Sequence, residues 1–126
     1  MFKKLMTITI FSALFSTAVF ADQERIDHYK GEPSPTLAVA MKNFVEYNQR
    51  LQAVLAKGEL TVEDMVLIHE LTYTLENALE RIREDLEELA ETLEEVHVAS
   101  ETMDYDTAKK AGALYLETAK IITSGQ

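Results

Sequence analysis

Two side chains that can bind metals lie one helical turn apart near the middle of the sequence. Met65 and His69 are four residues apart, so on a helix they are neighbours on one face. A thioether beside an imidazole is a ligand pair that suits Cu(I) or a haem iron. The next histidine, His97, is 28 residues away, about 42 Å along a helix, and cannot bind the same ion. The alternative is structural, with His69 flanking the core and hydrogen-bonded to Asn48.

The sequence contains none of the common catalytic motifs. It has no Cys, which excludes disulfides, thiolate catalysis, zinc–thiolate sites and the Cys-x-x-Cys-His haem attachment sequence. A nucleophile elbow and a Gly-rich phosphate loop are also missing, and the nearest approach to His-Glu-x-x-His has Tyr73 in place of the second histidine. We therefore expect a protein that is not an enzyme and that holds no cofactor.

A dense run of carboxylates follows the histidine. From Glu76 to Glu101 there are ten carboxylates and two arginines. Seven of them fall on the side of the predicted helix away from its apolar positions: Glu80, Glu84, Glu87, Glu88, Glu91, Glu94 and Glu95. The first interpretation is a solvated face that keeps the protein soluble. The second is a surface for a cationic protein partner, or for weakly held Mg²⁺ or Ca²⁺ that would relieve repulsion between the glutamates.

Charge and composition exclude further classes of protein. The 126 residues include 12 Lys and Arg against 22 Asp and Glu, a formal net charge of −10. Binding to nucleic acid or to an anionic membrane surface requires the opposite charge. The length allows one domain. Four Gly and two Pro, beside abundant Ala, Leu and Glu, indicate an all-helical chain.

The first 21 residues have the order of a secretory signal peptide. Lys3 and Lys4 precede an uncharged run of sixteen residues that ends at Phe20, and Ala21 completes a small-residue cleavage site. Sixteen helical residues reach about 24 Å, which is short of the about 30 Å core of a membrane. We expect cleavage after Ala21, a periplasmic location and no membrane association afterwards. The predicted divisions are a signal peptide (1–21), an extended arm (22–34) and a helical domain (35–126).

The spacing of apolar residues predicts two helices of moderate length. One covers about 35–57, with Ser34 as its N-cap, Pro35 in its first turn and Gly58 as a left-handed stop. Its apolar face is Leu37, Met41, Phe44, Asn48, Leu51 and Leu55. The other covers about 105–122, after a break at 100–104. Its apolar stripe is Ala108, Ala111, Leu114, Tyr115, Ala119, Ile121 and Ile122.

Between them lies a longer predicted helix, about 62–99. Thr61 and Asp64 resemble a capping box at its start, and neither Gly nor Pro interrupts it. Five successive heptads follow. Their first apolar positions form what we name the a row: Met65, Thr72, Leu79, Leu86 and Leu93. The positions three residues later form the d row: Ile68, Leu75, Ile82, Leu89 and Val96. Together the two rows predict a coiled-coil seam.

These lengths predict an all-α fold with a long central helix (about 62–99) on which two shorter antiparallel helices (about 35–57 and 105–122) fold back and meet near Ile82. An extended N-terminal arm precedes them. Such a bundle is only two helices thick, so something must cover the rest of the seam. The candidates are the arm, through Ile26, His28 and Tyr29, and a second copy of the chain. We expect a homodimer, because a heptad seam of this length is normally matched by another.

Three segments together resemble a known family: Arg25–Glu32, Ile68–Leu79 and Leu93–Glu101. The family consists of small exported helical proteins from Gram-negative proteobacteria and is described only as a domain of unknown function. The resemblance covers nearly the whole mature chain. It implies export and an all-α fold, and it transfers no catalytic or binding residue.

The sequence therefore favours an exported, non-enzymatic helical interaction or structural protein. One alternative is a periplasmic metal- or haem-binding protein that uses Met65 and His69. A second alternative is an acid- or stress-responsive periplasmic chaperone, because protonation of the glutamates at low pH would remove repulsion and could rearrange a thin bundle.

Overall fold

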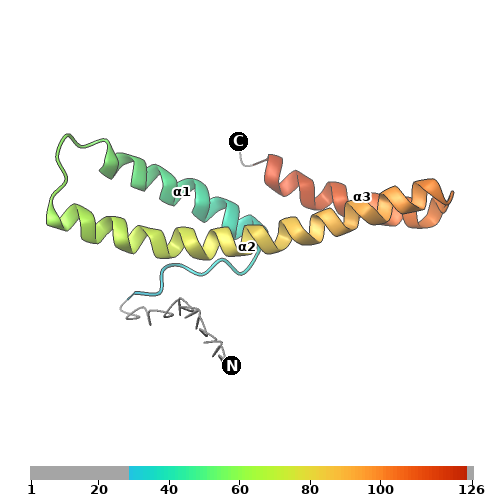
Figure 1. Ribbon diagram of the computed structural model, residues 1–126, viewed down its shortest axis with the longest axis horizontal. Coiled ribbons are helices and arrows are strands. Elements are labelled where there is room, and N and C mark those ends of the chain that lie inside the picture. The colour runs from blue at the N-terminus through green and yellow to red at the C-terminus, as the bar shows by residue number, and fades with distance from the viewer. Residues whose placement is uncertain (1–28, 125–126) are drawn as a thin grey trace, which may run out of the picture.

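The structure is a computed structural model that describes residues 29–124, and this part of the chain forms three helices (Figure 1). They are α1 (Leu37–Leu55), α2 (Val62–Glu101) and α3 (Tyr105–Thr123). α1 folds back on the first half of α2 and α3 on the second half, as predicted. The predicted signal peptide, its cleavage site, Ile26 and His28 lie outside the described residues.

The start of α2 is fixed by the predicted capping box. The Thr61 hydroxyl accepts a hydrogen bond from the Asp64 N–H (3.2 Å), and the Asp64 carboxylate accepts one from the Thr61 N–H (3.0 Å). The helix then continues unbroken for 40 residues, about 60 Å. It ends in the predicted break, where Met103 adopts a left-handed conformation (φ 56°) and Asp104 becomes the N-cap of α3.

The residues predicted to begin and end α1 are both wrong. The N-cap is Thr36, whose hydroxyl accepts the Val39 N–H (3.3 Å), and not Ser34. Ser34 is instead held by the Asn43 side-chain amide, which donates to its hydroxyl (3.1 Å). Gly58 is not a left-handed stop, because the helix has already ended at Leu55 and the connection over 56–61 is long enough to turn without one.

The buried face of α2 is rotated from the predicted seam. The d row faces the short helices as expected, with Leu75 buried and the other four members half-buried. The a row does not, because Leu79, Leu86 and Leu93 remain 50, 45 and 46% exposed. The second buried row precedes the a row by one residue and includes Asp64, Leu71, Ala78 and Ala99. The prediction of a buried d row is therefore confirmed, and the prediction of a buried a row is wrong.

Small side chains determine which face of α2 is buried. Thr74 and Ala78 on α2, and Ala40 near the start of α1, are all 0% exposed. Side chains of this size let two helix backbones approach closely, whereas a leucine of the a row at the same place would hold them apart. Ala40 and Ala78 are buried in this packing, whereas Thr74 is covered by Gly31 and Glu32 of the arm.

The face of α1 is rotated in the same way. Phe44 and Leu51 of the predicted face are half-buried, but Leu55 is exposed. The buried residues of α1 are Leu37, Ala40, Tyr47 and Val54. The main core cluster is formed by Tyr47, Val54, Leu71 and Leu75, with Phe44, Leu51 and Ile68 packed against it. The core therefore lies between α1 and the first half of α2.

The described part of the arm, residues 29–34, runs along α2 (Figure 1) and is held by Asn77 of α2 and Asn43 of α1. The Glu32 N–H donates to the buried Thr74 hydroxyl (3.0 Å). The Asn77 side-chain amide donates to the carbonyls of Lys30 and Glu32, 3.0 Å each. Nothing in the local sequence predicts these contacts, which join residues more than 40 positions apart.

Gly31 is the residue that lets the arm approach α2, and we expect Gly31→Ala to detach it. Gly31 has φ +67°, and a Cβ added there would lie 2.7 Å from the Thr74 nitrogen and 2.8 Å from the Tyr73 carbonyl carbon. Both are backbone atoms of a helix, which cannot move aside cheaply. The strain and the lost hydrogen bonds should lower the free energy of unfolding by about 1–3 kcal/mol, measured by urea denaturation.

Gly112 provides the matched control, since a Cβ added there meets nothing within 4 Å. The Gly112→Ala variant should become more stable by about 1 kcal/mol through helix propensity alone. If both alanine variants shift stability in the same direction, the assigned role of Gly31 is wrong.

Candidate functional site

The first candidate, the Met65 and His69 pair, lies on the solvent side of α2. Both side chains are exposed. The His69 Nε2 lies 3.3 Å from the Tyr73 hydroxyl, and the two rings meet edge to face with centroids 5.0 Å apart. The predicted hydrogen bond between His69 and Asn48 is wrong, because Asn48 donates to the Phe44 carbonyl (2.8 Å) within α1. His69 is positioned by its own helix.

No cluster of acidic, histidine or cysteine side chains surrounds this pair in the described residues. Within 29–124 there is no group of three or more His, Cys, Asp or Glu side chains placed to hold a metal ion. Tyr73, the nearest partner of His69, in turn meets the Tyr29 ring of the arm with centroids 6.1 Å apart. His69 thus belongs to a small aromatic group where the arm meets α2, whereas Met65 is exposed one turn earlier.

The second candidate, the acidic face of α2, is exposed throughout. All seven glutamates predicted to face solvent do so: Glu80, Glu84, Glu87, Glu88, Glu91, Glu94 and Glu95. The two arginines of this segment are held by carboxylates one turn further along. Arg81 makes a two-pronged contact with Asp85 (2.6 and 3.1 Å), and Arg83 pairs with Glu87 (2.8 Å). The Asp85 carboxylate raises the pKa of Arg81.

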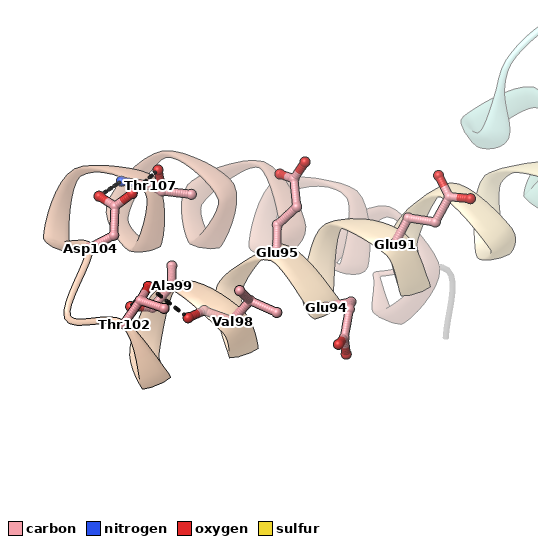
Figure 2. A pocket seen from close by; sticks show the side chains of 8 residues that line it. All are labelled: Glu91, Glu94, Glu95, Val98, Ala99, Thr102, Asp104 and Thr107. Atoms are coloured by element: carbon pink, nitrogen blue, oxygen red, sulfur yellow. Dashed lines mark hydrogen bonds between the residues drawn. The ribbon is translucent and has the colours of Figure 1, made fainter.

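Part of the acidic face forms an open groove beside the turn between α2 and α3 (Figure 2). Its floor is apolar and includes Val98 and Ala99, while its rim carries carboxylates. The groove has a volume of about 470 Å³ and is lined by Glu91, Glu94, Glu95, Val98, Ala99, Thr102, Asp104 and Thr107. An apolar floor with an acidic rim suits the aliphatic stem and charged head of a lysine or arginine side chain.

The rim carboxylate of Asp104 is already engaged as the N-cap of α3. It accepts hydrogen bonds from the Thr107 hydroxyl (2.8 Å) and the Thr107 N–H (3.1 Å), drawn in Figure 2. These bonds lower the pKa of Asp104. The glutamates of the rim are therefore the side chains that a cationic group would meet.

The third candidate is an apolar flank that begins on the α1–α2 pair and continues along the second half of α2. One side of this pair is occupied by the arm, which Asn43 of α1 and Asn77 of α2 hold. By helical spacing, the opposite side carries the a row of α2 together with residues 41, 48 and 55 of α1. We name this surface the apolar flank: Met41, Asn48 and Leu55 on α1, and Met65, Thr72, Leu79, Leu86 and Leu93 on α2.

The apolar flank is exposed because the buried faces of α1 and α2 are both rotated away from the predicted ones. Each helix has an apolar stripe that is wider than its contact with the other helix, and both stripes extend toward the same side. Met65 and Leu55 at one end of the flank are each 55% exposed, and the three leucines of the a row continue it along α2. The three exposed leucines span about 21 Å, and with Met65 the row is about 42 Å long, which indicates a surface for another protein.

The comparison with known proteins identifies the chain at family level. The model of a family of unknown function, DUF6746, matches residues 1–124. The chain belongs to this family. The match confirms the resemblance to an uncharacterised family, and DUF6746 transfers no site to the chain. No curated protein and no solved structure matches it.

In the part of the chain that the structure describes, no helix combines the length and the apolar character needed to cross a membrane. The long helix α2 is too rich in carboxylates, with the acidic face along its second half.

The turn between α1 and α2 packs against a buried carboxylate, Asp64, in the first turn of α2. The buried Asp64 carboxylate is paired with the Lys57 ammonium and accepts the Thr61 N–H. Lys57 first, and then the Thr61 N–H, lower the pKa of Asp64. Because this pKa is lower in the folded than in the unfolded chain, ionised Asp64 stabilises the fold above about pH 4. That contribution is lost as the pH falls through the folded-state pKa.

We therefore expect Asp64→Asn to lower the Tm by several degrees at pH 7 and to flatten the fall in Tm between pH 5 and pH 2. Thermal melts across this range measure both effects. The control is Glu59→Gln, which removes one negative charge from the same turn at an exposed position. Equal pH profiles for the wild type and Asp64→Asn would show that this carboxylate does not couple stability to pH.

Proposed function

We propose that the chain is an exported, non-enzymatic helical interaction or structural protein that acts as a homodimer joined through the apolar flank. The single observation that carries the proposal is the exposed a row of α2, with Leu79, Leu86 and Leu93 each about half accessible. Export is supported by the order of residues 1–21, from a positive start through an apolar run to a small-residue cleavage site.

A second copy of the chain is the occupant that the surroundings favour. α1 and α3 pack on the other side of the d row, and residues 29–34 of the arm run along α2, held by Thr74 and Asn77. The surface that lacks a neighbour among the described residues repeats every seven residues. A helix with the same repeat matches it best, and this chain carries one.

The leucines alone do not account for a stable dimer. Burying the exposed half of one leucine contributes about 1 kcal/mol, so three from each copy supply about 6 kcal/mol. Association itself costs about 4–15 kcal/mol. The proposal therefore needs the whole flank, including Met65 and Leu55 at its end, and it predicts an affinity of moderate strength.

Native mass spectrometry of the mature chain, residues 22–126, tests the proposal. We expect a species of twice the chain mass that carries no ligand. A monomer at tens of micromolar protein would contradict the dimer. A retained copper ion or haem would instead favour the metal-binding alternative with Met65 and His69.

A second candidate function, an acid-responsive chaperone, is favoured by the two turns. Both rest on carboxylates with a lowered pKa: Asp64 in the first turn of α2 and Asp104 at the N-cap of α3. Protonation of both would loosen both turns and expose apolar surface. Helicity and the fluorescence of an apolar dye, followed from pH 7 to pH 2, test this function, because both aspartates have a lowered pKa. Unchanged helicity without dye binding would exclude it.

A further inference from the structure

The a row has a natural centre, which limits how two copies can pair. Its five members are seven residues apart, from Met65 to Leu93, and Leu79 is the middle one. In an antiparallel dimer with its two-fold axis at Leu79, every member has a partner. Leu79 meets its own copy, Leu86 meets Thr72, and Leu93 meets Met65. The full length of the row, about 42 Å, is then used.

Charges beside the row favour this same axis. Glu76 and Arg83 are exposed, lie on either side of Leu79 and occupy equivalent heptad positions next to the a row. With the axis at Leu79, Glu76 of one copy lies within one residue of the partner's Arg83, and symmetry makes this contact twice. Arg83 already pairs with Glu87 of its own helix, so it would lie between two carboxylates.

Other arrangements bring like charges together. A parallel dimer places Glu76 against Glu76 and Arg83 against Arg83. It also places residues 80–95, which carry eight carboxylates and two arginines, against themselves. An antiparallel dimer with its axis at Leu86 sets these same segments beside each other. The axis at Leu79 sets each of them beside residues 63–78, which carry four carboxylates.

From this placement, and resting on the self-association proposed above, we propose that two copies pair antiparallel along α2 with the two-fold axis at Leu79 and with Glu76 of each facing Arg83 of the other. Since α1 covers the first half of α2 and α3 the second, each end of the dimer then holds α1 of one copy beside α3 of the other. Four helices share each end, which thickens the bundle.

Single-cysteine cross-linking tests the register, because the native chain contains no Cys. Under mild oxidation, Leu79→Cys should form a covalent dimer at high yield. Leu93→Cys alone should not, since its two copies would lie about 42 Å apart, but a mixture of Leu93→Cys and Met65→Cys should. Leu114→Cys is the control for random collision, because this exposed residue lies seven positions after Thr107, which lines the groove on the acidic face.

The outcomes separate the register from the dimer itself. Self-cross-linking of Leu93→Cys as efficient as that of Leu79→Cys indicates a parallel dimer and overturns the proposal. Higher yield from Leu86→Cys than from Leu79→Cys moves the axis and also overturns it. A chain that is monomeric by native mass spectrometry defeats the proposed function as well, whereas a dimer with the wrong cross-links defeats only the register.

Charge reversal gives an independent readout of the same contact. Glu76→Arg and Arg83→Glu each set like charges opposite one another across the axis. Each should therefore raise the Kd of the dimer about tenfold at low salt. The double variant Glu76→Arg, Arg83→Glu restores opposite charges and should recover most of the affinity. A double variant weaker than either single one would overturn the pairing.

Discussion

Replacing Leu79 by aspartate is expected to convert the proposed dimer into a folded monomer. In the single chain Leu79 is 50% exposed, so a carboxylate there costs the fold little. In the dimer two carboxylates would face each other at the axis, removed from water and without a cation between them. We expect the Kd to rise at least about a hundredfold, measured by sedimentation equilibrium, with an unchanged far-ultraviolet circular dichroism spectrum.

Leu114→Asp is the matched control for this variant. Leu114 is 55% exposed and lies on α3, seven residues after Thr107, which lines the groove on the acidic face. It should leave the dimer Kd unchanged within about twofold. If the two aspartate variants weaken the dimer equally, or neither does, the apolar flank is not the interface.

Leu75→Ala is expected to have the largest effect on the fold itself. Leu75 is a buried member of the d row and of the core cluster with Tyr47, Val54 and Leu71. Removing a buried leucine side chain typically costs about 2–5 kcal/mol, which is a large part of the stability of a domain of this size. We expect the Tm to fall by about 10–20 °C, or the chain to be partly unfolded at 37 °C.

Leu114→Ala is the matched control for Leu75→Ala. This substitution also removes a leucine side chain from a helix, but from an exposed position. It should change the Tm by no more than a few degrees when both variants are measured at the same protein concentration. Equal losses of Tm in the two variants would contradict the assignment of Leu75 to the core.

The helices and their order were predictable because their boundaries depend on local signals. Thr61 and Asp64 fix the start of α2 within one turn of sequence, and the cluster of short polar residues at 100–104 fixes its end. These interactions form between neighbours in the chain, so the sequence contains both partners side by side. The cap of α1 was missed because Ser34 and Thr36 are equally suitable residues two positions apart.

The rotation of α2 was not predictable from its apolar pattern. The pattern gives weight to large apolar side chains, and by that measure the a row is as good a buried face as any. The structure instead buries the row with Ala78 and Asp64, because small side chains allow close approach and Asp64 has Lys57 as a partner. Both reasons depend on residues of other segments, which a pattern within one helix does not contain.

The attachment of the arm was missed for a related reason. Thr74 and Asn77 are polar residues on an otherwise amphipathic helix, and on their own they suggest solvent exposure. They hold Glu32 and Lys30, more than 40 residues earlier. The available signal was Gly31, a glycine outside any predicted turn, which marks a close approach between two backbones.

The candidate sites also differ in how far the sequence of one helix predicts them. The acidic face was predicted correctly as exposed, since its position follows from the heptad alone, and a cationic partner for it stays a prediction. The environment of His69 was predicted wrongly, because it depends on Tyr73 and Tyr29 rather than on Asn48. Membership of a family of unknown function adds no assignment of residues to either site.

The most direct test of the central claim is the solvent accessibility of the leucine methyl groups, measured by NMR with a soluble paramagnetic agent at increasing protein concentration. If the a row is the dimer interface, the relaxation enhancement of Leu79, Leu86 and Leu93 falls as the dimer forms, while that of Leu114 stays constant. Enhancement of the three a-row leucines that remains as high as that of Leu114 at every concentration would contradict the account.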